Sequence, residues 1–141
     1  MIQNISHIAI AVNSFNDIKN WKALFDGKFK EKMYRSESQQ VDALVFYNNK
    51  IKIEFLKPLN LNSPISNFLK KNKLGGIHHI SFCTDNFDDN LKVLKKEKIR
   101  TITRGGNVSG VDGNKICFLN PMDLNGVLVE LEKKEENNDY K

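Results

Sequence analysis

The chain contains an internal repeat, and this repeat constrains the fold more than any single motif does. The segment HIAIAV begins at His7 and the segment HISFCT begins at His79, so the two copies align at one constant offset of 72 residues. Each segment is followed by a short polar stretch containing a phenylalanine, NSFND in the first copy and DNFDD in the second. A duplicated unit predicts two similar modules that bury their apolar faces together.

Both copies predict a strand, a helix and three further strands. In the first copy these elements are expected at residues 5–12, 14–25, 30–36, 41–47 and 51–56. In the second copy they are expected at residues 77–84, 87–96, 100–104, 115–119 and 126–132. Each copy therefore predicts the order βαβββ.

The two copies are joined by a connector that predicts a short helix. Ser63 and Pro64 form a good N-cap and first-turn pair, and the glycines at 75 and 76 end the segment, so a helix is expected at 64–73. We expect one domain at 1–132, with a first module at about 1–59, a connector at 60–76 and a second module at about 77–132. The polar segment 133–141 predicts a disordered tail.

One histidine and one glutamate recur in each copy. Residues two apart on a strand share a face, so His7 and His79 are expected to lie beside small residues, with space in front of each imidazole. Glu54 and Glu130 lie within apolar runs, and a buried carboxylate is costly unless it is paired or bound to a metal. Any one of these residues alone would more often be an exposed or hydrogen-bonded residue. Four at corresponding places favour a shared site.

Two imidazoles and two carboxylates favour a divalent metal ion such as Co, Mn, Ni, Fe or Zn. A closed structural zinc site would more often contain cysteines. Cys83 and Cys117 are more readily explained as small buried apolar residues, although Cys83 shares the face of His79 and could line a pocket. His78 is expected to point to the opposite face from His79, because adjacent strand residues alternate.

Composition excludes several classes of protein. The chain has 141 residues and a net charge of +5, but its lysines are dispersed and no basic stripe alternates with aromatic residues, so nucleic acid is an unfavoured partner. The lysine clusters at 70–73 and 95–98 are either solvated helix faces or an attraction for an anionic small molecule. No apolar stretch is long enough to span a membrane. Two cysteines and no signal-peptide pattern predict a cytoplasmic protein.

The residues between 5 and 132 resemble the methylmalonyl-CoA epimerases of the vicinal-oxygen-chelate superfamily, which also includes the glyoxalases. The His/Glu pairs are typical of the superfamily as a whole, whereas the connector and the double histidine narrow the resemblance to the epimerases. The matching segments are HIAIAV from His7, IEFLKPL from Ile53, SPISNFL from Ser63, GGIHHI from Gly75 and GVLVEL from Gly126.

The resemblance implies an α+β fold in which two tandem βαβββ modules form curled mixed sheets around a metal-binding cavity. It implies a divalent metal ion held by His7, Glu54, His79 and Glu130, and an acyl-CoA thioester as substrate. The implied reaction interconverts (R)- and (S)-methylmalonyl-CoA by abstraction of the α-proton through a metal-stabilised enolate. We assign Glu54 and Glu130 as the catalytic base and acid, one on each face of the substrate. The resemblance also suggests a homodimer.

The sequence departs from the family in places. Some bacterial epimerases have a catalytic glutamate where this chain has Ala43, which leaves Glu54 as the substitute. Relatives often have a histidine and a lysine around the positions of Asp112 and Asn114, and His-Pro-Lys where this chain has Asn120, Pro121 and Met122. If those groups contact the CoA portion of the substrate, Lys115, Lys71 or Lys73 could compensate for them.

Other functions on this scaffold stay open. The first is a lactoylglutathione lyase-like isomerase that acts on a glutathione hemithioacetal. The second is a non-catalytic protein that binds a small molecule. A metal-dependent dioxygenase fits less well, because such sites usually have one carboxylate.

Overall fold

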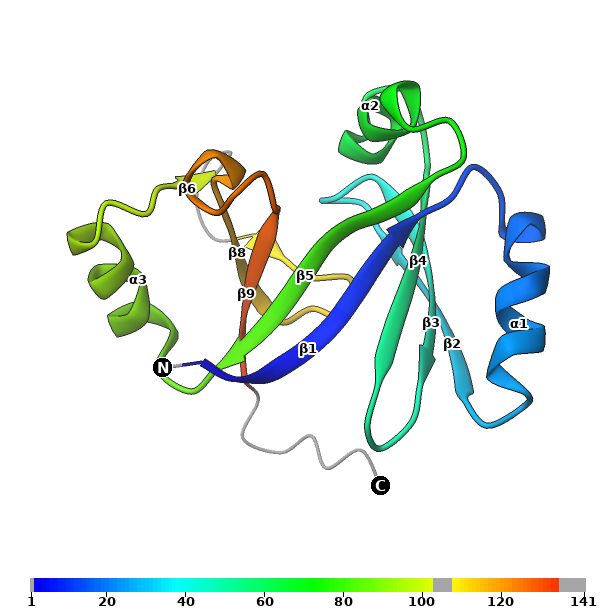
Figure 1. The fold of residues 1–141 in the computed structure, drawn as a ribbon, viewed down its shortest axis with the longest axis horizontal. Coiled ribbons are helices and arrows are strands. Elements are labelled where there is room, and N and C mark those ends of the chain that lie inside the picture. Colours follow the sequence, from blue (N-terminus) through cyan, green and yellow to red (C-terminus); the bar gives the residue numbers. More distant parts are fainter. Residues whose placement is uncertain (1, 103–107, 135–141) are drawn as a thin grey trace.

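Two similar halves form one continuous mixed sheet of nine strands (Figure 1). The computed structural model describes residues 2–102 and 108–134. The first half contains β1 (Ile2–Ala11), β2 (Lys30–Ser36), β3 (Val41–Tyr47) and β4 (Lys52–Pro58). The second contains β5 (Gly76–Thr84), β6 (Thr101–Ile102), β7 (Val108–Ser109), β8 (Lys115–Leu119) and β9 (Val129–Lys133). The helices are α1 (Lys19–Phe25), α2 (Pro64–Lys71) and α3 (Phe87–Lys96), with single 3-10 turns at Phe15–Ile18 and Pro121–Asp123.

The strand order is β2-β3-β4-β1-β5-β9-β8-β6, with β7 also paired to β8. In each half the first strand pairs in parallel with the last one, β1 with β4 and β5 with β9. The halves meet where β1 and β5 pair antiparallel. The predicted α+β fold with a curled mixed sheet is therefore confirmed.

The two halves do not pack face to face as separate sheets, as the duplicated pattern had suggested. They join edge to edge through β1 and β5. The physical reason is that each of these strands would otherwise be an edge with unpaired backbone groups, and pairing satisfies both edges at once.

The helices α1 and α3 lie on the two outer flanks of the curled sheet (Figure 1). Ile10 and Phe55 face α1 and pack against Ile18 and Phe25. Phe87 of α3 packs against the apolar side chains of β8 and β9 in the same way. These two cores fix the outer face of each half, so the alternating residues of the central strands must point to the inner face.

The inner face combines small apolar residues with the polar site. Ala9, Ala11 and Ala43 are fully buried there, and they pack with Leu56 and with residues of α2. Small side chains on this face leave room that larger ones would fill. The space needed by a ligand is therefore a consequence of the alanines.

Several predicted boundaries differ from the structure, and β1 begins at Ile2 rather than at 5 and β9 at Val129 rather than at 126. The helix expected from 14 begins as a 3-10 turn, with Ser14 and Asp17 forming a capping box, and α2 ends at Lys71 rather than at 73. The strand expected at 100–104 is limited to Thr101–Ile102 in the described residues, and 103–107 lie outside them. The expected tail does not begin at 133, because Lys133 belongs to β9 and the Lys134 N–H donates to the Thr84 carbonyl at 2.9 Å. Residues 135–141 lie outside the described part of the chain.

Across the described residues, no helix is both long enough and apolar enough to cross a lipid bilayer.

The connector reaches β5 through a turn that requires glycine at position 75. Gly75 has a φ of +83°, and a Cβ atom there would overlap the carbonyl oxygen of Ala11. Gly27, after α1, has a similar φ of +66° but no atom within 4 Å of its ideal Cβ position. The two glycines therefore separate the cost of backbone conformation from the cost of a clash.

We expect Gly75→Ala to lower the free energy of unfolding by about 2–4 kcal/mol, the sum of a left-handed conformation and forced overpacking. Gly27→Ala should lose only about 1–2 kcal/mol, because it has the first cost alone. Urea denaturation of both variants measures the difference. Equal losses would show that the connector does not press against the end of β1.

Candidate metal centre and active site

The four residues singled out from the sequence lie on four neighbouring strands at the middle of the sheet. Glu54 is on β4, His7 on β1, His79 on β5 and Glu130 on β9, and the sheet order places these strands side by side. Glu54 and His79 both lie opposite Ala9 in the strand register, and Glu130 lies opposite Ser81. All four side chains are buried.

The two imidazoles meet through their Nε2 atoms, which are 3.3 Å apart. The His7 Nε2 atom is 3.2 Å from Glu54 Oε2 and 3.5 Å from Glu130 Oε1. The His79 Nε2 atom is 3.5 Å from Glu130 Oε2. His7, His79 and Glu130 form one group with ligand atoms within 4.8 Å of one another, whereas Glu54 lies outside this group and contacts His7.

These separations fit a common metal ion. Bonds of about 2.0–2.2 Å place adjacent ligand atoms about 2.8–3.1 Å apart in octahedral geometry and about 3.3–3.6 Å apart in tetrahedral geometry. The observed spacings of 3.2–3.5 Å between donors fall in or at the edge of these ranges. Glu54 Oε1 is buried and accepts no hydrogen bond within the described structure, and the Lys52 ammonium lies 3.6 Å from it. The donor set and this acceptor therefore fit a divalent cation, and the ligand roles stay a prediction.

The ionisable groups of the site perturb one another strongly. Burial opposes protonation of His7, but the adjacent Glu54, Glu132 and Glu130 carboxylates raise its pKa to about 9. Burial raises the pKa of Glu130 to about 7, and the neighbouring Glu54 charge adds to this effect. Burial and the nearby His7 hold the pKa of His79 well below its ordinary value. Groups buried this close together compete for protons, and a bound cation would relieve the repulsion between the carboxylates.

Each glutamate of the site has a different polar neighbour. The Ser81 hydroxyl donates to Glu130 Oε1 at 2.8 Å. The Lys52 ammonium lies 3.6 Å from Glu54 Oε1 and 3.1 Å from Asp112 Oδ2. A neutral hydroxyl therefore holds Glu130, and a cation lies beside Glu54.

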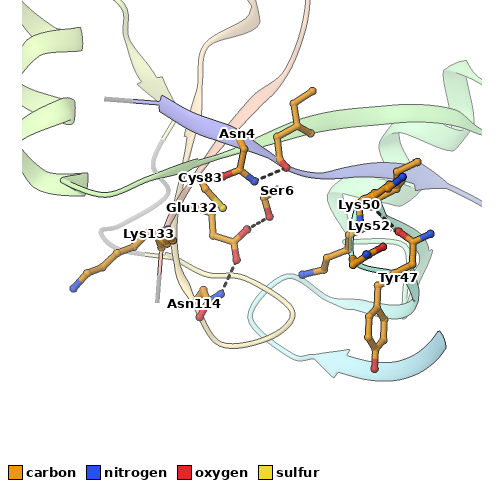
Figure 2. Close-up of a pocket in the computed structure, with 14 residues that line it drawn as sticks. Asn4, Ser6, Tyr47, Lys50, Lys52, Cys83, Asn114, Glu132 and Lys133 are labelled. Carbon is orange, nitrogen blue, oxygen red and sulfur yellow. Dashed lines mark hydrogen bonds between the residues drawn. The ribbon is translucent and has the colours of Figure 1, made fainter. Parts of the chain in front are cut away.

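Glu132 is a buried carboxylate that the sequence interpretation missed. It accepts hydrogen bonds from the Ser6 hydroxyl and, at 2.6 Å, from Asn114 Nδ2 (Figure 2). Its Oε2 lies 3.6 Å from His7 Nδ1, on the side of the ring opposite the ligand group. Burial raises the pKa of Glu132, but interactions with His7, Asn114 and Ser6 outweigh it and lower the pKa to about 2. The spacing from Glu130 could have revealed it, because residues two apart on β9 share a face.

Two β-bulges place a polar side chain beside each histidine. In β1 the register passes from Ile5 opposite Phe82 to His7 opposite Ser81, so Ser6 is the extra residue. In β5 the register passes from Ala9 opposite His79 to Ile10 opposite Ile77, so His78 is the extra residue. Ser6 and His78 are equivalent positions of the repeat.

The bulge overturns the prediction that His78 points away from His79. The His78 Nδ1 and His79 Nδ1 atoms are 2.9 Å apart, and the His78 ring packs edge-on against Phe68 with centroids 5.2 Å apart. A bulge breaks the alternation of side chains, which is why both histidines lie on one face. Burial lowers the pKa of His78 to about 4.

Two cavities flank the site at its two ends. Lys52 and Leu56 lie two residues before and two residues after Glu54 on β4, and they line different cavities. The cavity of about 310 Å³ is mainly apolar and is lined by residues such as Leu56, Phe118, His78 and His79. The cavity of about 200 Å³ is more polar and is lined by residues such as Lys50, Lys52 and Glu132 (Figure 2).

Cys83 lines the smaller cavity, whereas Cys117 is buried in the core beneath α3. Asn114 is connected to the site by the hydrogen bond that it donates to Glu132. The Lys115 Nζ atom pairs with Asp88 of α3 at 2.7 Å. Asn120 caps the second 3-10 turn, and Met122 is exposed.

Comparisons with known proteins agree with this geometry. Residues 6–118 match the model of the glyoxalase/bleomycin resistance protein/dioxygenase superfamily. A mitochondrial methylmalonyl-CoA epimerase of Dictyostelium discoideum is 38% identical over 134 residues, which are 94% of this chain and 80% of that protein. The chain belongs to the methylmalonyl-CoA epimerase family. An ethylmalonyl-CoA/methylmalonyl-CoA epimerase of Cereibacter sphaeroides is 34% identical over 94% of this chain and 99% of its own length.

The fold is shared with solved members of this family. A Streptomyces coelicolor methylmalonyl-CoA epimerase in complex with 2-nitronate-propionyl-CoA superposes with a TM-score of 0.84 at 26% identity. The match covers 95% of this chain and 99% of that one. The resemblance seen in the sequence is therefore confirmed at the level of the family and the fold.

We expect Glu132→Gln to weaken Co²⁺ binding about 10–100-fold, because a carboxylate beside the outer nitrogen of a ligand histidine orients the ring and raises its basicity. Isothermal titration calorimetry of the metal-free protein measures the affinity. Lys50→Ala is the matched control, since Lys50 lines the same cavity and its side chain is exposed. Equal affinities for wild type and Glu132→Gln would exclude this role.

Proposed function

We propose that this chain interconverts (R)- and (S)-methylmalonyl-CoA, with His7, Glu54, His79 and Glu130 holding a divalent metal ion such as Co, Mn, Ni, Zn or Fe. The observation that carries the proposal is the pair of buried carboxylates from related halves. Glu54 and Glu130 both contact His7 Nε2, and they come from β4 and β9, which flank the two central strands.

The reaction needs one base and one acid on opposite faces of a planar carbon. The α-hydrogen of the substrate is acidic because it lies between a carboxylate and a thioester carbonyl. When bound, the metal ion supplies Lewis-acid stabilisation of the negative charge that develops on the substrate oxygens. Inversion follows if one glutamate removes the proton and the other returns a proton to the opposite face.

Glu54 is the candidate for the base that removes the proton from one face of the substrate. Its Oε1 atom is buried and accepts no hydrogen bond in the described structure, so a lone pair is available to a substrate proton. Glu130 is held by the Ser81 hydroxyl and faces the site from the other half. Ala43 cannot provide a base, because its methyl side chain has no ionisable group; it packs in the core with Ala9, Ala11 and Leu56. This supports Glu54 as the replacement for the glutamate of some relatives.

The larger cavity is the candidate site for the acyl group. It combines apolar walls with the His79 ring at its inner end. Its lining can cover the methyl-bearing carbon and limit the access of water to a reactive carbanion. The cavity thus offers binding and protection next to the proposed proton donors and acceptors.

We expect Glu54→Gln and Glu130→Gln each to slow exchange of the substrate α-hydrogen with solvent deuterium by at least about 100-fold, since each removes one general acid–base group. Proton NMR of racemic methylmalonyl-CoA in deuterated buffer measures the exchange. The control is Glu31→Gln, an exposed glutamate on β2 that should exchange as wild type does. Undiminished exchange in both site variants would refute the assignment.

The same assay separates the other candidate functions. A chelator should abolish exchange in the wild type, and readdition of Co²⁺ should restore it. Turnover of methylglyoxal with glutathione, without methylmalonyl-CoA exchange, would indicate a lactoylglutathione lyase-like isomerase. Ligand binding that needs no metal and gives no exchange would indicate a non-catalytic binding protein.

We also infer a homodimer from the family resemblance, and the cytoplasmic location stays a prediction. Exposed apolar residues such as Ile5 and Leu74 offer surface for a second copy. Light scattering after size-exclusion chromatography should give twice the chain mass of 16.2 kDa. A mass equal to one chain would contradict the inference.

A further inference from the structure

One of the two adjacent histidines of β5, His78, has no role in the proposed metal site. His78 is half-buried, and its Nδ1 atom lies 2.9 Å from His79 Nδ1. Two ring nitrogens at this distance require one proton between them, which one ring donates and the other accepts.

The proposed metal site decides which ring donates. His79 faces the ligand group through Nε2, which lies 3.3 Å from His7 Nε2 and 3.5 Å from Glu130 Oε2. A histidine that binds a metal through Nε2 has no proton there, so a neutral ring has its proton on Nδ1. His79 Nδ1–H therefore donates, and His78 Nδ1 accepts.

The same reasoning assigns the proton of His78. Because its Nδ1 accepts, a neutral His78 has its proton on Nε2. His78 lines the larger cavity together with His79, Leu56 and Ile65, and no described residue accepts a hydrogen bond from its Nε2. The ring therefore has an N–H donor available to a molecule in that cavity.

The equivalent position in the other half is used differently. Ser6 contacts His7 Nδ1 at 3.1 Å and donates to the buried Glu132. That chain of contacts ends in a carboxylate of the protein. The contact from His79 instead passes through His78 to the cavity wall, so the repeat has diverged at this position.

We propose that His78 positions His79 through Nδ1 and donates its Nε2–H to an oxygen of the acyl thioester in the larger cavity. The inference rests on the proposed metal site and deepens the proposed function. It makes one side chain serve two tasks, because metal binding by His79 fixes the tautomer that His78 presents to the substrate.

Two substitutions separate these tasks. Asparagine has its amide oxygen the same number of bonds from Cα as His Nδ1, so His78→Asn can keep the acceptor for His79 and loses the outer donor. Glutamine has its amide nitrogen the same number of bonds from Cα as His Nε2, so His78→Gln can keep the donor and loses the acceptor. His78→Phe removes both.

For His78→Asn we expect Co²⁺ affinity within about twofold of wild type and kcat/KM about tenfold lower, the effect of one lost hydrogen bond. For His78→Gln we expect the Co²⁺ affinity to fall by up to about 10-fold. Its kcat/KM at saturating Co²⁺ should stay close to that of the wild type. His78→Phe should show both losses. If the Asn and Gln variants behave alike, His78 has only a structural role and the proposal is wrong.

NMR of the histidine rings tests the tautomers without turnover. The chain has three histidines, so long-range ¹H–¹⁵N spectra of the Zn²⁺-loaded protein can be assigned with the single variants. We expect the proton of His79 on Nδ1 and that of His78 on Nε2, and the opposite tautomer of His78 would overturn the proposal. Propionyl-CoA should shift the His78 Nε2–H signal, whereas free CoA, which lacks the acyl carbonyl, should not. Equal shifts would exclude donation to the thioester.

Failure of the proposed function is a separate result. A wild type that binds Co²⁺ but exchanges no α-hydrogen would refute the epimerase assignment. The tautomers and the Co²⁺ affinities would still confirm or refute the positioning role.

Discussion

The antiparallel pairing of β1 with β5 is the contact on which the site depends. It joins the two halves of the repeat and places Ala9 opposite His79 and His7 opposite Ser81. Because the same strand of each half lies at this junction, equivalent histidines come together with their Nε2 atoms 3.3 Å apart. The parallel pairings of β4 and β9 with these strands then add one glutamate from each side. A site on a pseudo-twofold axis follows directly from joining two copies at an edge.

Burial is what gives these side chains their unusual properties. Four ionisable residues lie on the inner face of a sheet whose outer face is fixed by two aromatic and aliphatic cores. Ionised groups taken out of water need partners, and here each has a different one, Glu132 for His7, His78 for His79, Ser81 for Glu130 and Lys52 for Glu54. The duplicated site is therefore symmetric in its proposed ligands and asymmetric in the groups that surround them. Such asymmetry suits a reaction in which the two faces of one carbon are treated differently.

The periodicity of the sequence predicted most of the elements and the orientation of the four site residues, but not β7. Alternation along β4 and β9 placed Glu54 and Glu130 opposite their apolar neighbours, and the structure has them buried on the inner face. The same rule failed at His78, because an extra residue in β5 interrupts the alternation. It also gave no sign of Ser6 or Asn114, since the contact of Ser6 with Glu132 depends on a bulge in the other half, and that of Asn114 on the loop between β7 and β8.

The sequence alone thus determined the repeat, the family and the identity of the four residues proposed as metal ligands, because these are properties of residue type and spacing. The tertiary structure decided that the two halves share one sheet, that Glu54 stands slightly apart from the other three, and that His78 lies beside His79. These features depend on the register between strands distant in the chain. A shift of one residue in that register turns a side chain to the other face, and no local pattern records it.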